Sequence, residues 1–169
     1  NLISRGKNLY GANQFYEKLL TYNTLPANIS KVTKDGRECI RLCNHSAFYS
    51  GANIKMYADG LFKPNTRYTM TYQYLQACVE NGGTTDVGLL IGIMYTDGSI
   101  YSQAGNTRNI WVTVSYTTEA NKTIKYIRYS YGTGGTPTYL DVNTFQIEEG
   151  IAPTAFEPDV RTTIPLPEL

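Results

Sequence analysis

Apolar and polar residues alternate along segment after segment of this chain, which is the pattern of strands with one buried face. From Arg67 to Gln76, tyrosines and a methionine occupy every second position, and residues 110–116 repeat the alternation. Asp35-Gly36 and Asp97-Gly98 each stand between two such segments, and Asp-Gly pairs favour the tight turns of β-hairpins. Because these segments recur roughly every 10 to 20 residues with turn residues between them, the pattern predicts an all-β sandwich.

Three further segments carry the strand pattern, and one carries a weak helical pattern. Residues 86–95, 123–131 and 139–148 are rich in β-branched and aromatic residues, which favour strands. Apolar residues fall on both faces of residues 86–95, so that strand is predicted to be buried on both sides. Residues 13–20 show little helical periodicity, and we expect no more than one short turn there.

The length of the chain indicates how many domains it forms. With 169 residues, it suits one domain built around a single hydrophobic core. We assign residues 1–160 to one β-sandwich domain, and residues 161–169, which contain two prolines, to a connector toward a following segment. The sequence starts without a methionine, and we expect it to be a fragment of a longer protein.

Charge and hydropathy argue against two classes of partner. The formal net charge is +1, so no strong field would draw the protein to nucleic acid or to an acidic membrane surface. No apolar run reaches the ~18 residues that suggest a membrane-spanning helix, and Asn1–Arg5 lacks the core of a signal peptide. We therefore expect neither nucleic-acid binding nor membrane insertion from this fragment.

Side chains that carry catalysis or bind transition metals form no recognisable set. Glu148 and Glu149 are neighbours in a predicted strand and would point to opposite faces, so they cannot flank one glycosidic bond. His45 is the only histidine, and the sequence has no nucleophile motif for it to serve. Cys39 and Cys43 would lie roughly 13 Å apart in a strand, too far for a disulfide, and zinc-finger spacing is absent. We therefore expect reduced cysteines and no enzymatic activity.

Tyrosine is the most distinctive residue type, with 15 tyrosines against 5 phenylalanines. A buried tyrosine hydroxyl needs a hydrogen-bond partner, so this excess predicts that many of the rings are half exposed. Exposed aromatic rings can stack on the apolar face of pyranose rings, while nearby amide and guanidinium groups bond to sugar hydroxyls. The alternative for each single ring is a structural place at the edge of the core, because tyrosine is also a good strand former.

Trp111 stands out among the candidates for such a platform. It is out of phase with Ile110, Val112 and Val114, so it points away from the core if those three point into it. The alternative is that a loop caps its ring. The candidate glycan-binding residues are Trp111, Tyr95, Tyr101, Tyr126, Arg128, Tyr129, Tyr131 and Gln73.

The run from residue 139 to residue 158 carries a resemblance to a known family. It reads as a strand, an acidic turn closed by Gly150, and a tail with Pro153 and Pro158, which cannot continue a sheet. This ending resembles the close of carbohydrate-binding-module-like domains in phage tail and prophage minor structural proteins. The residues that carry the pattern are Gln146, Glu148, Gly150, Thr154, Phe156, Glu157 and Pro158. Four earlier segments of this chain resemble earlier parts of the same domains: residues 7–10, 39–42, 62–70 and 111–128.

The resemblance implies a β-sandwich jelly roll of the galactose-binding and carbohydrate-binding-module type. It also implies a non-catalytic module on a phage tail or at the bacterial cell exterior, with host cell-surface polysaccharide and other tail segments as partners. Two alternatives remain open. One is a structural spacer or assembly module of the tail with no sugar ligand, and the other is an accessory module of a secreted bacterial glycosidase.

The same resemblance implies a structural calcium ion. In jelly-roll modules of this kind, an aspartate of the last strand binds calcium together with backbone carbonyls, and Asp141 stands at the matching place. Calcium takes six to eight oxygen ligands, so one carboxylate is not enough, and Glu17 is a candidate for a second. No other cofactor is expected.

Overall fold

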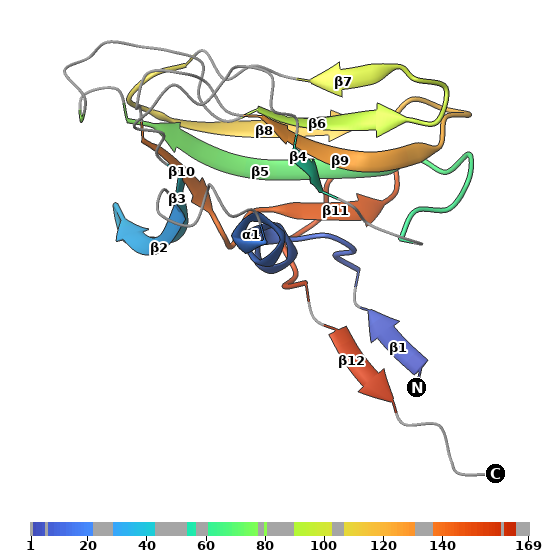
Figure 1. Ribbon diagram of the computed structural model, residues 1–169, viewed down its shortest axis with the longest axis horizontal. Coiled ribbons are helices and arrows are strands. Elements are labelled where there is room, and N and C mark those ends of the chain that lie inside the picture. The colour runs from blue at the N-terminus through green and yellow to red at the C-terminus, as the bar shows by residue number, and fades with distance from the viewer. Residues whose placement is uncertain are drawn as a thin grey trace.

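The computed structural model describes residues 2–5, 7–21, 29–42, 54–56, 61–77, 80, 90–102, 107–130, 137–159 and 161–164. Within them lie one helix, α1 (Ala12–Leu20), and twelve strands in three antiparallel sheets (Figure 1). The larger sheet contains β2 (Ile29–Lys34), β3 (Arg37–Leu42), β5 (Tyr68–Gln76), β8 (Trp111–Thr117), β10 (Thr138–Asp141) and β11 (Gln146–Glu149). The smaller sheet contains β4 (Ile54–Met56), β6 (Leu90–Tyr95), β7 (Ile100–Ser102) and β9 (Ile124–Ser130). The third sheet pairs β1 (Leu2–Arg5) with β12 (Arg161–Ile164).

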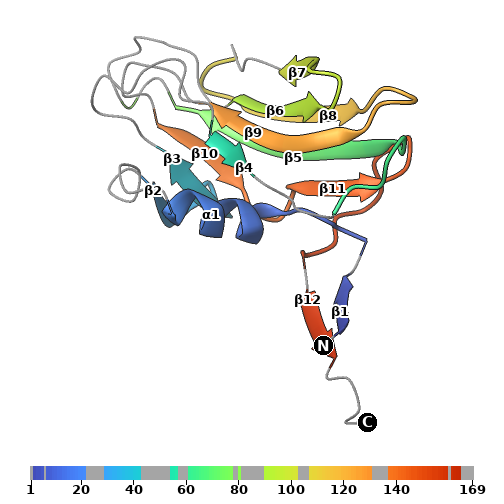
Figure 2. The ribbon, with the colours of Figure 1, turned by 45° about the vertical axis from the view of Figure 1, so that its right-hand side comes forward.

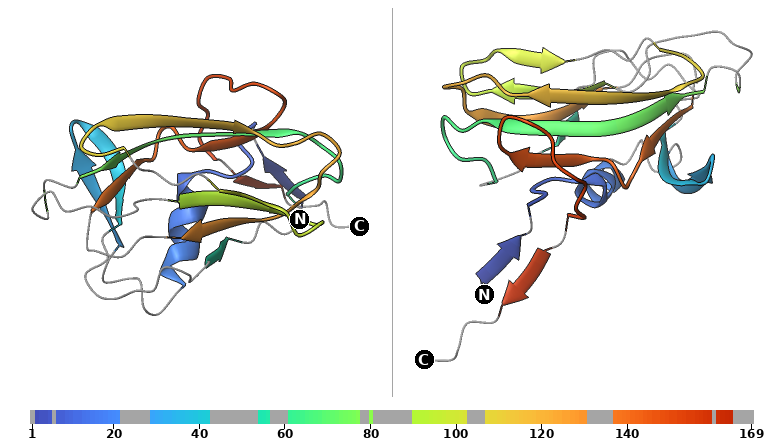
Figure 3. Two further views of the ribbon diagram at one scale, coloured as in Figure 1. Left: turned by 90° about the horizontal axis from the view of Figure 1, so that it is seen from above. Right: turned by 180° about the vertical axis from the view of Figure 1, so that it is seen from behind.

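β5 is the central strand of the larger sheet. β8 pairs with its residues 69–75 along one edge, while β11 pairs with residues 68–71 and β10 with residues 74–76 along the other. β3 continues the sheet from β10, and β2 follows at the edge. Seen from above, β8 and β5 lie in one layer and β6 and β9 in the other (Figure 3). The protein is thus an all-β sandwich of the jelly-roll type, and the predicted fold class is confirmed.

The hydrophobic core lies between these two layers. Alternate residues of each strand point into it, and β5 contributes Tyr68, Met70, Tyr72 and Tyr74. The face of β6 and β9 that meets them carries Ile91, Ile93, Ile127 and Tyr129. The Asp35-Gly36 and Asp97-Gly98 hairpins are confirmed, since they join β2 to β3 and β6 to β7.

Tyrosine fills much of this core, which corrects the expectation of many half-exposed rings. In the described part of the chain, eight tyrosines are at most 8% exposed: Tyr10, Tyr68, Tyr72, Tyr74, Tyr95, Tyr126, Tyr129 and Tyr139. Several of these rings have hydrogen-bond partners for their hydroxyls. The Tyr68 hydroxyl accepts a hydrogen bond from the Lys63 backbone N–H at 2.7 Å, and the Tyr95 and Tyr116 hydroxyls lie 2.9 Å apart.

Helix α1 is longer than the short turn predicted for residues 13–20, because tertiary contacts stabilise it. Its side chains Phe15 and Leu19 are fully buried in the core. Gly11 at its N-cap has no side chain to satisfy the first amides. Asp159, far along the chain, takes that role and accepts hydrogen bonds from the Gln14 backbone N–H at 3.1 Å and from Asn13 at 3.2 Å.

The strand predicted over residues 139–148 is two strands, β10 and β11. Between them the Asp141 side chain accepts a hydrogen bond from the Asn143 backbone N–H at 2.9 Å, and the Asp141 carbonyl accepts one from Thr144. An aspartate that bonds to the backbone two residues later forms a turn and interrupts a sheet ladder. Both strands still pair with β5, one at each end of it.

The segment that follows β11 is held to the sandwich by a polar network, which we call the C-terminal latch: the buried Asn8, Gln146 and Glu148, together with Thr154 and Glu157. The Glu148 carboxylate is 2% exposed and accepts hydrogen bonds from the Thr154 hydroxyl at 2.6 Å, the Thr154 N–H at 3.2 Å and the Gln146 amide. Gln146 in turn accepts one from the Glu157 N–H at 2.8 Å. Asn8 donates to the Glu157 carbonyl at 3.0 Å and accepts from the Ile147 N–H at 3.1 Å.

β1 and β12 form a ribbon beside the sandwich. They lie side by side, with Leu2 opposite Ile164, and the ribbon points away from the two larger sheets (Figures 1 and 3). Residues 161–164, assigned above to a connector, are therefore paired with the start of the chain. The helix found within the described residues does not have the length and hydrophobicity needed to cross a membrane.

Gly92 of β6 marks a position where the sheet tolerates no side chain. A Cβ atom there would lie 2.5 Å from the Tyr101 carbonyl oxygen and 3.0 Å from the Arg128 Cγ. Because the first of these atoms belongs to the backbone of the paired strand, we expect Gly92→Ala to lower the free energy of unfolding by about 2 kcal/mol. Urea unfolding measures this change. Gly36→Ala cannot serve as the control, because the φ of 74° at Gly36 would strain the backbone of an alanine there. If Gly92→Ala is as stable as the unaltered protein, β7 can shift far enough to accommodate the added methyl group.

Candidate functional site

The outer face of the larger sheet carries a second group of apolar side chains. Because side chains alternate along β5, Tyr74 points into the core and Leu75 points outward. Trp111 on β8 lies opposite Leu75 in the sheet register. We call this group the outer cluster, and its members are Cys39, Leu75, Ala77 and Tyr139, with Val32 and Trp111 packed against them.

Trp111 meets Arg37 across this face. The Arg37 guanidinium carbon lies 4.3 Å from the centre of the Trp111 ring, a distance at which a cation is attracted to the face of the ring. The indole N–H donates a hydrogen bond to Asp35 at 3.0 Å. β5 and β10 lie between the strands that carry the two residues, so the long side chains meet above those strands. The Trp111 ring is thereby held in one orientation and stays half exposed.

Asp141 and Gln73 lie beneath the Arg37 guanidinium. Arg37 donates from one nitrogen to Asp141 at 2.9 Å and to the Gln73 side-chain oxygen. The Asp141 residue is 5% exposed, and its other oxygen accepts the Asn143 N–H. Burying a carboxylate to this degree is costly unless it is paired or hydrogen-bonded, and Arg37 supplies both a charge and a hydrogen bond. Trp111, Arg37, Gln73, Asp141 and Asp35 form one connected group, which we call the Trp111 site.

A further charged group flanks the Trp111 site. Glu80 accepts hydrogen bonds from Lys34 at 2.9 Å and from the Tyr139 hydroxyl at 2.7 Å. Burial raises the pKa of the Glu80 carboxyl, but these two hydrogen bonds outweigh it and leave the pKa below its ordinary value. Burial also raises the pKa of the neighbouring Cys39 thiol to about 11, so the thiol stays protonated and unreactive at neutral pH.

The arrangement around Asp141 does not suit calcium. Both carboxylate oxygens already have partners, in Arg37 and Asn143. Across the residues that the structure describes, no three histidine, cysteine, aspartate or glutamate side chains gather as a metal site would require. Glu17 is exposed on α1 and is not among the groups that contact Asp141.

We expect removal of calcium to leave the stability of the protein unchanged. Arg37 already balances the charge of Asp141, so we expect no calcium ion at Asp141 for a chelator to remove. Thermal unfolding with EDTA and with millimolar calcium measures this directly, and magnesium serves as the control cation. A rise in Tm that calcium produces and magnesium does not would restore the calcium hypothesis.

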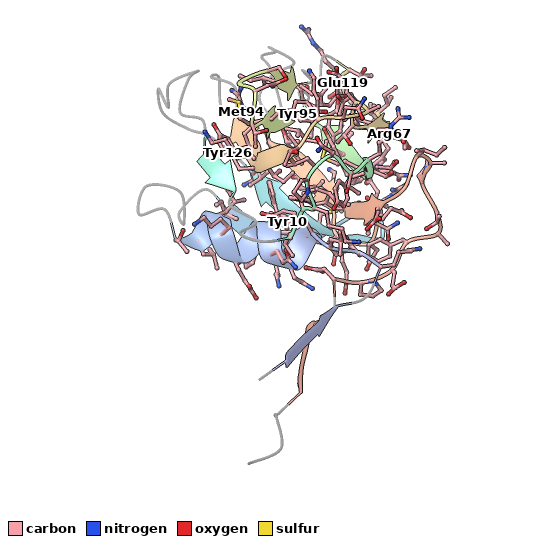
Figure 4. All side chains as sticks on the ribbon, turned by 90° about the vertical axis from the view of Figure 1, so that its right-hand side faces the viewer. Tyr10, Arg67, Met94, Tyr95, Glu119 and Tyr126 are labelled. Atoms are coloured by element: carbon pink, nitrogen blue, oxygen red, sulfur yellow. The ribbon has the colours of Figure 1, made fainter. Side chains whose placement is uncertain are left out.

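The other predicted ligand-binding residues lie elsewhere. Tyr95 and Tyr129 are in the core, and Tyr101 stacks on Tyr116 between the layers, with ring centres 3.3 Å apart. Tyr126 and Arg128 are on the outer face of the smaller sheet, where Tyr126 is buried beside Met94 (Figure 4). Tyr131, Cys43, Cys78 and His45 lie outside the described residues.

Of the predicted set, the structure thus brings together Trp111, Gln73 and Asp141. The sequence analysis missed Arg37 and Asp35, which complete the site. The Asp35-Gly36 turn was a usable signal for a hairpin at this position. The contact with Trp111 was not predictable, because it joins residues 74 positions apart whose strands are not neighbours in the sheet.

No family model matches the chain, and no curated protein matches its sequence. Among solved structures, the CBM22-1–GH10 modules of an endo-1,4-beta-D-xylanase from Clostridium thermocellum, complexed with xylohexaose, are similar with a TM-score of 0.46 and 10% identity. The match covers 72% of this chain and 24% of that chain. The CBM22-1 xylan-binding domain of a Paenibacillus barcinonensis protein has a TM-score of 0.45 and 13% identity, with 74% of this chain and 81% of that one covered.

A third similar structure is the C-terminal family 22 carbohydrate binding module of a Clostridium thermocellum protein. Its TM-score is 0.39 and its identity 14%, with 72% of this chain and 78% of that chain covered. At these identities and TM-scores the matches carry no argument about what this chain binds. What the Trp111 site can bind therefore follows from its own residues.

Proposed function

We propose that this protein is a non-catalytic carbohydrate-binding module whose ligand lies across the Trp111 site. The observation that carries the proposal is the half-exposed Trp111 ring, held in place by Arg37 and Asp35 on a sheet face that also carries amide and guanidinium groups. An aromatic surface next to convergent polar groups is the usual composition of a sugar site. Because neighbouring side chains hold the ring, little side-chain entropy is lost when a ligand binds.

The charges of the site favour a neutral glycan. Two basic side chains on this face have acidic partners, with Arg37 bonded to Asp141 and Lys34 to Glu80, both at 2.9 Å. A strongly anionic polysaccharide would have to compete with these carboxylates for the cations. Sugar hydroxyls can bond to the same groups without separating any pair, because they both donate and accept.

The broader setting of this function is also part of the proposal. The C-terminal resemblance supports a module of a phage or prophage tail protein that binds a host cell-surface polysaccharide. Weak single sites would then act together through the many copies on a tail. An accessory module of a secreted bacterial glycosidase would use the same site. In either setting catalysis would belong to other parts of the assembly, because Glu148 is buried in the latch and Glu149 is exposed and bonded to Lys63.

Intrinsic fluorescence tests the proposal, since Trp111 is the only tryptophan in the chain. The protein is titrated with a bacterial cell-wall polysaccharide and with xylan, and we expect a saturable change in emission for at least one of them. The same titration with free tryptophan amide corrects for absorption by the polysaccharide. Flat titrations, together with no retention of a multivalent display of the module on host cell walls, would contradict glycan binding.

The β1–β12 ribbon favours a second candidate, in which the fold serves as a spacer. A paired ribbon beside the sandwich suits a module that sets a distance between neighbouring parts of an assembly. In that case Trp111 would be covered by a second protein chain and would bind no sugar. Light scattering combined with fluorescence quenching by acrylamide separates the two functions, because only the spacer predicts a stable oligomer with a shielded tryptophan.

A further inference from the structure

We infer that the protein has a second saccharide-binding pocket, between α1 and the β2–β3 hairpin and on the side of the hairpin opposite to Trp111. The pocket has a volume of about 460 Å³. This volume falls within the range of small-molecule sites in proteins. Its walls come from separate parts of the chain, and they include Ala12, Asn13, Lys31, Glu38, Ile40 and Val142. Figure 2 shows α1 beside the two strands of the hairpin.

The sheet register places the pocket and the Trp111 site on opposite faces of the hairpin. Val32 lies opposite Cys39, and both pack in the outer cluster. Lys31 lies opposite Ile40 and belongs to the other face, since neighbouring residues of a strand alternate. Ile40 is part of the main core, which confirms that this second face points toward α1. Val32 and Cys39 of the outer cluster also border the pocket, but Trp111 does not line it, so a ligand there would not contact the Trp111 ring.

An amine and a carboxylate with no ionic partner face the pocket. Within the described residues, neither Lys31 nor Glu38 takes part in an ion pair, although both line the pocket. The Lys31 ammonium is held 4.7 Å from the centre of the Tyr16 ring. An anionic ligand would satisfy Lys31 and oppose Glu38, and a cationic ligand would do the reverse. A neutral ligand with several hydroxyl groups satisfies both, because each hydroxyl accepts from the ammonium or donates to the carboxylate.

The remaining walls match the rest of a sugar ring. Val142 and Val32 are partly exposed and offer apolar surface to the C–H groups of a pyranose, while Ala12 and Ile40 lie buried behind them. Asn13 adds a side-chain amide, which Asp159 orients through a 3.2 Å hydrogen bond. A pocket of this size and composition suits a single sugar unit or a disaccharide. This second pocket does not depend on the Trp111 site.

A nitrogen-15 amide NMR titration tests the inference residue by residue. The probes are glucose, xylose and N-acetylglucosamine, together with cellobiose, xylobiose and chitobiose. With at least one probe we expect saturable shifts of the amides of residues 31–33 and 38–40, and these shifts persist in Trp111→Ala. Lys31→Met and Glu38→Gln each weaken this binding at least about tenfold, since each removes a hydrogen bond to a charged group. The matched controls are Lys125→Met and Glu17→Gln, which alter exposed residues that do not line the pocket and leave the affinity unchanged.

The outcomes separate this inference from the proposed function. Shifts confined to the Trp111 site would overturn the second pocket and leave the proposed function intact. Shifts at the pocket alone would support the second pocket and count against the Trp111 site. No shift of residues 31–33 and 38–40 with any probe would overturn the inference, as would affinities unaffected by Lys31→Met and Glu38→Gln.

Discussion

Replacing Trp111 by alanine is expected to weaken binding of the module to its polysaccharide by at least about 30-fold, the loss typical of a central aromatic residue in a binding site. The ring supplies the only large apolar surface of the Trp111 site, and it also orients Arg37 above Gln73 and Asp141. Affinity electrophoresis in gels that contain the polysaccharide measures the change, because it does not depend on tryptophan fluorescence.

Two further variants distinguish loss of the ligand platform from loss of packing. Leu75→Ala removes apolar volume from the same outer cluster but leaves the ring, so we expect lower stability and nearly unchanged affinity. Ile110→Ala removes a neighbouring side chain that is 58% exposed and outside the cluster, and it should change neither quantity. If Trp111→Ala folds normally and binds as tightly as the unaltered protein, the ligand does not lie on this face.

Replacing Glu148 by alanine is expected to lower the free energy of unfolding by about 2 kcal/mol, because it leaves the buried Gln146 amide and the donors of Thr154 in the C-terminal latch without their acceptor. Those donors are the Thr154 hydroxyl and N–H and the Gln146 amide. The segment that carries Asp159 should then detach more easily, and with it the cap of α1. Urea unfolding gives the change in free energy, and hydrogen exchange of the Gln14 amide reports on the cap.

The neighbouring glutamate is a matched control for this experiment. Glu149 differs from Glu148 by one position along β11 but lies at the exposed end of the strand, where it forms an ion pair with Lys63. Exposed pairs of this kind contribute little, so Glu149→Ala should be as stable as the unaltered protein. Glu148→Gln keeps the volume and part of the hydrogen bonding and should lie between the two. Equal stability of the Glu148→Ala and Glu149→Ala variants would show that the latch does not hold the C-terminal segment.

The latch also explains the motif that carries the family resemblance. Gln146, Glu148, Thr154 and Glu157 bond to one another. None of these four belongs to the Trp111 site or lines the second pocket. The motif therefore holds the segment after β11 against the sandwich. A resemblance in these residues is evidence for the fold, and the ligand has to be sought on other surfaces.

Local pattern was sufficient for most of the strands and turns. Alternation over residues 67–76 predicted β5, and the two Asp-Gly turns predicted the β2–β3 and β6–β7 hairpins. These features depend on neighbours in sequence, which is why they are visible there. The interruption between β10 and β11 was missed, because it depends on how the Asp141 side chain turns back to its own backbone. The length of α1 was missed because its N-terminus is capped by Asp159, 145 residues after the amide that it binds.

By itself, the sequence determined that the chain forms an all-β sandwich, that Trp111 lies out of phase with the core residues of its strand, and that Glu148 and Glu149 face opposite ways. Each of these follows from the period-two geometry of a strand. Only the tertiary structure decided that Tyr95 and Tyr129 are core residues, and that Arg37 lies over Trp111 while bonded to Asp141. The physical reason is that alternation shows only which residues of one strand share a face. The order of the strands in the sheets decides which residues of different strands meet on that face.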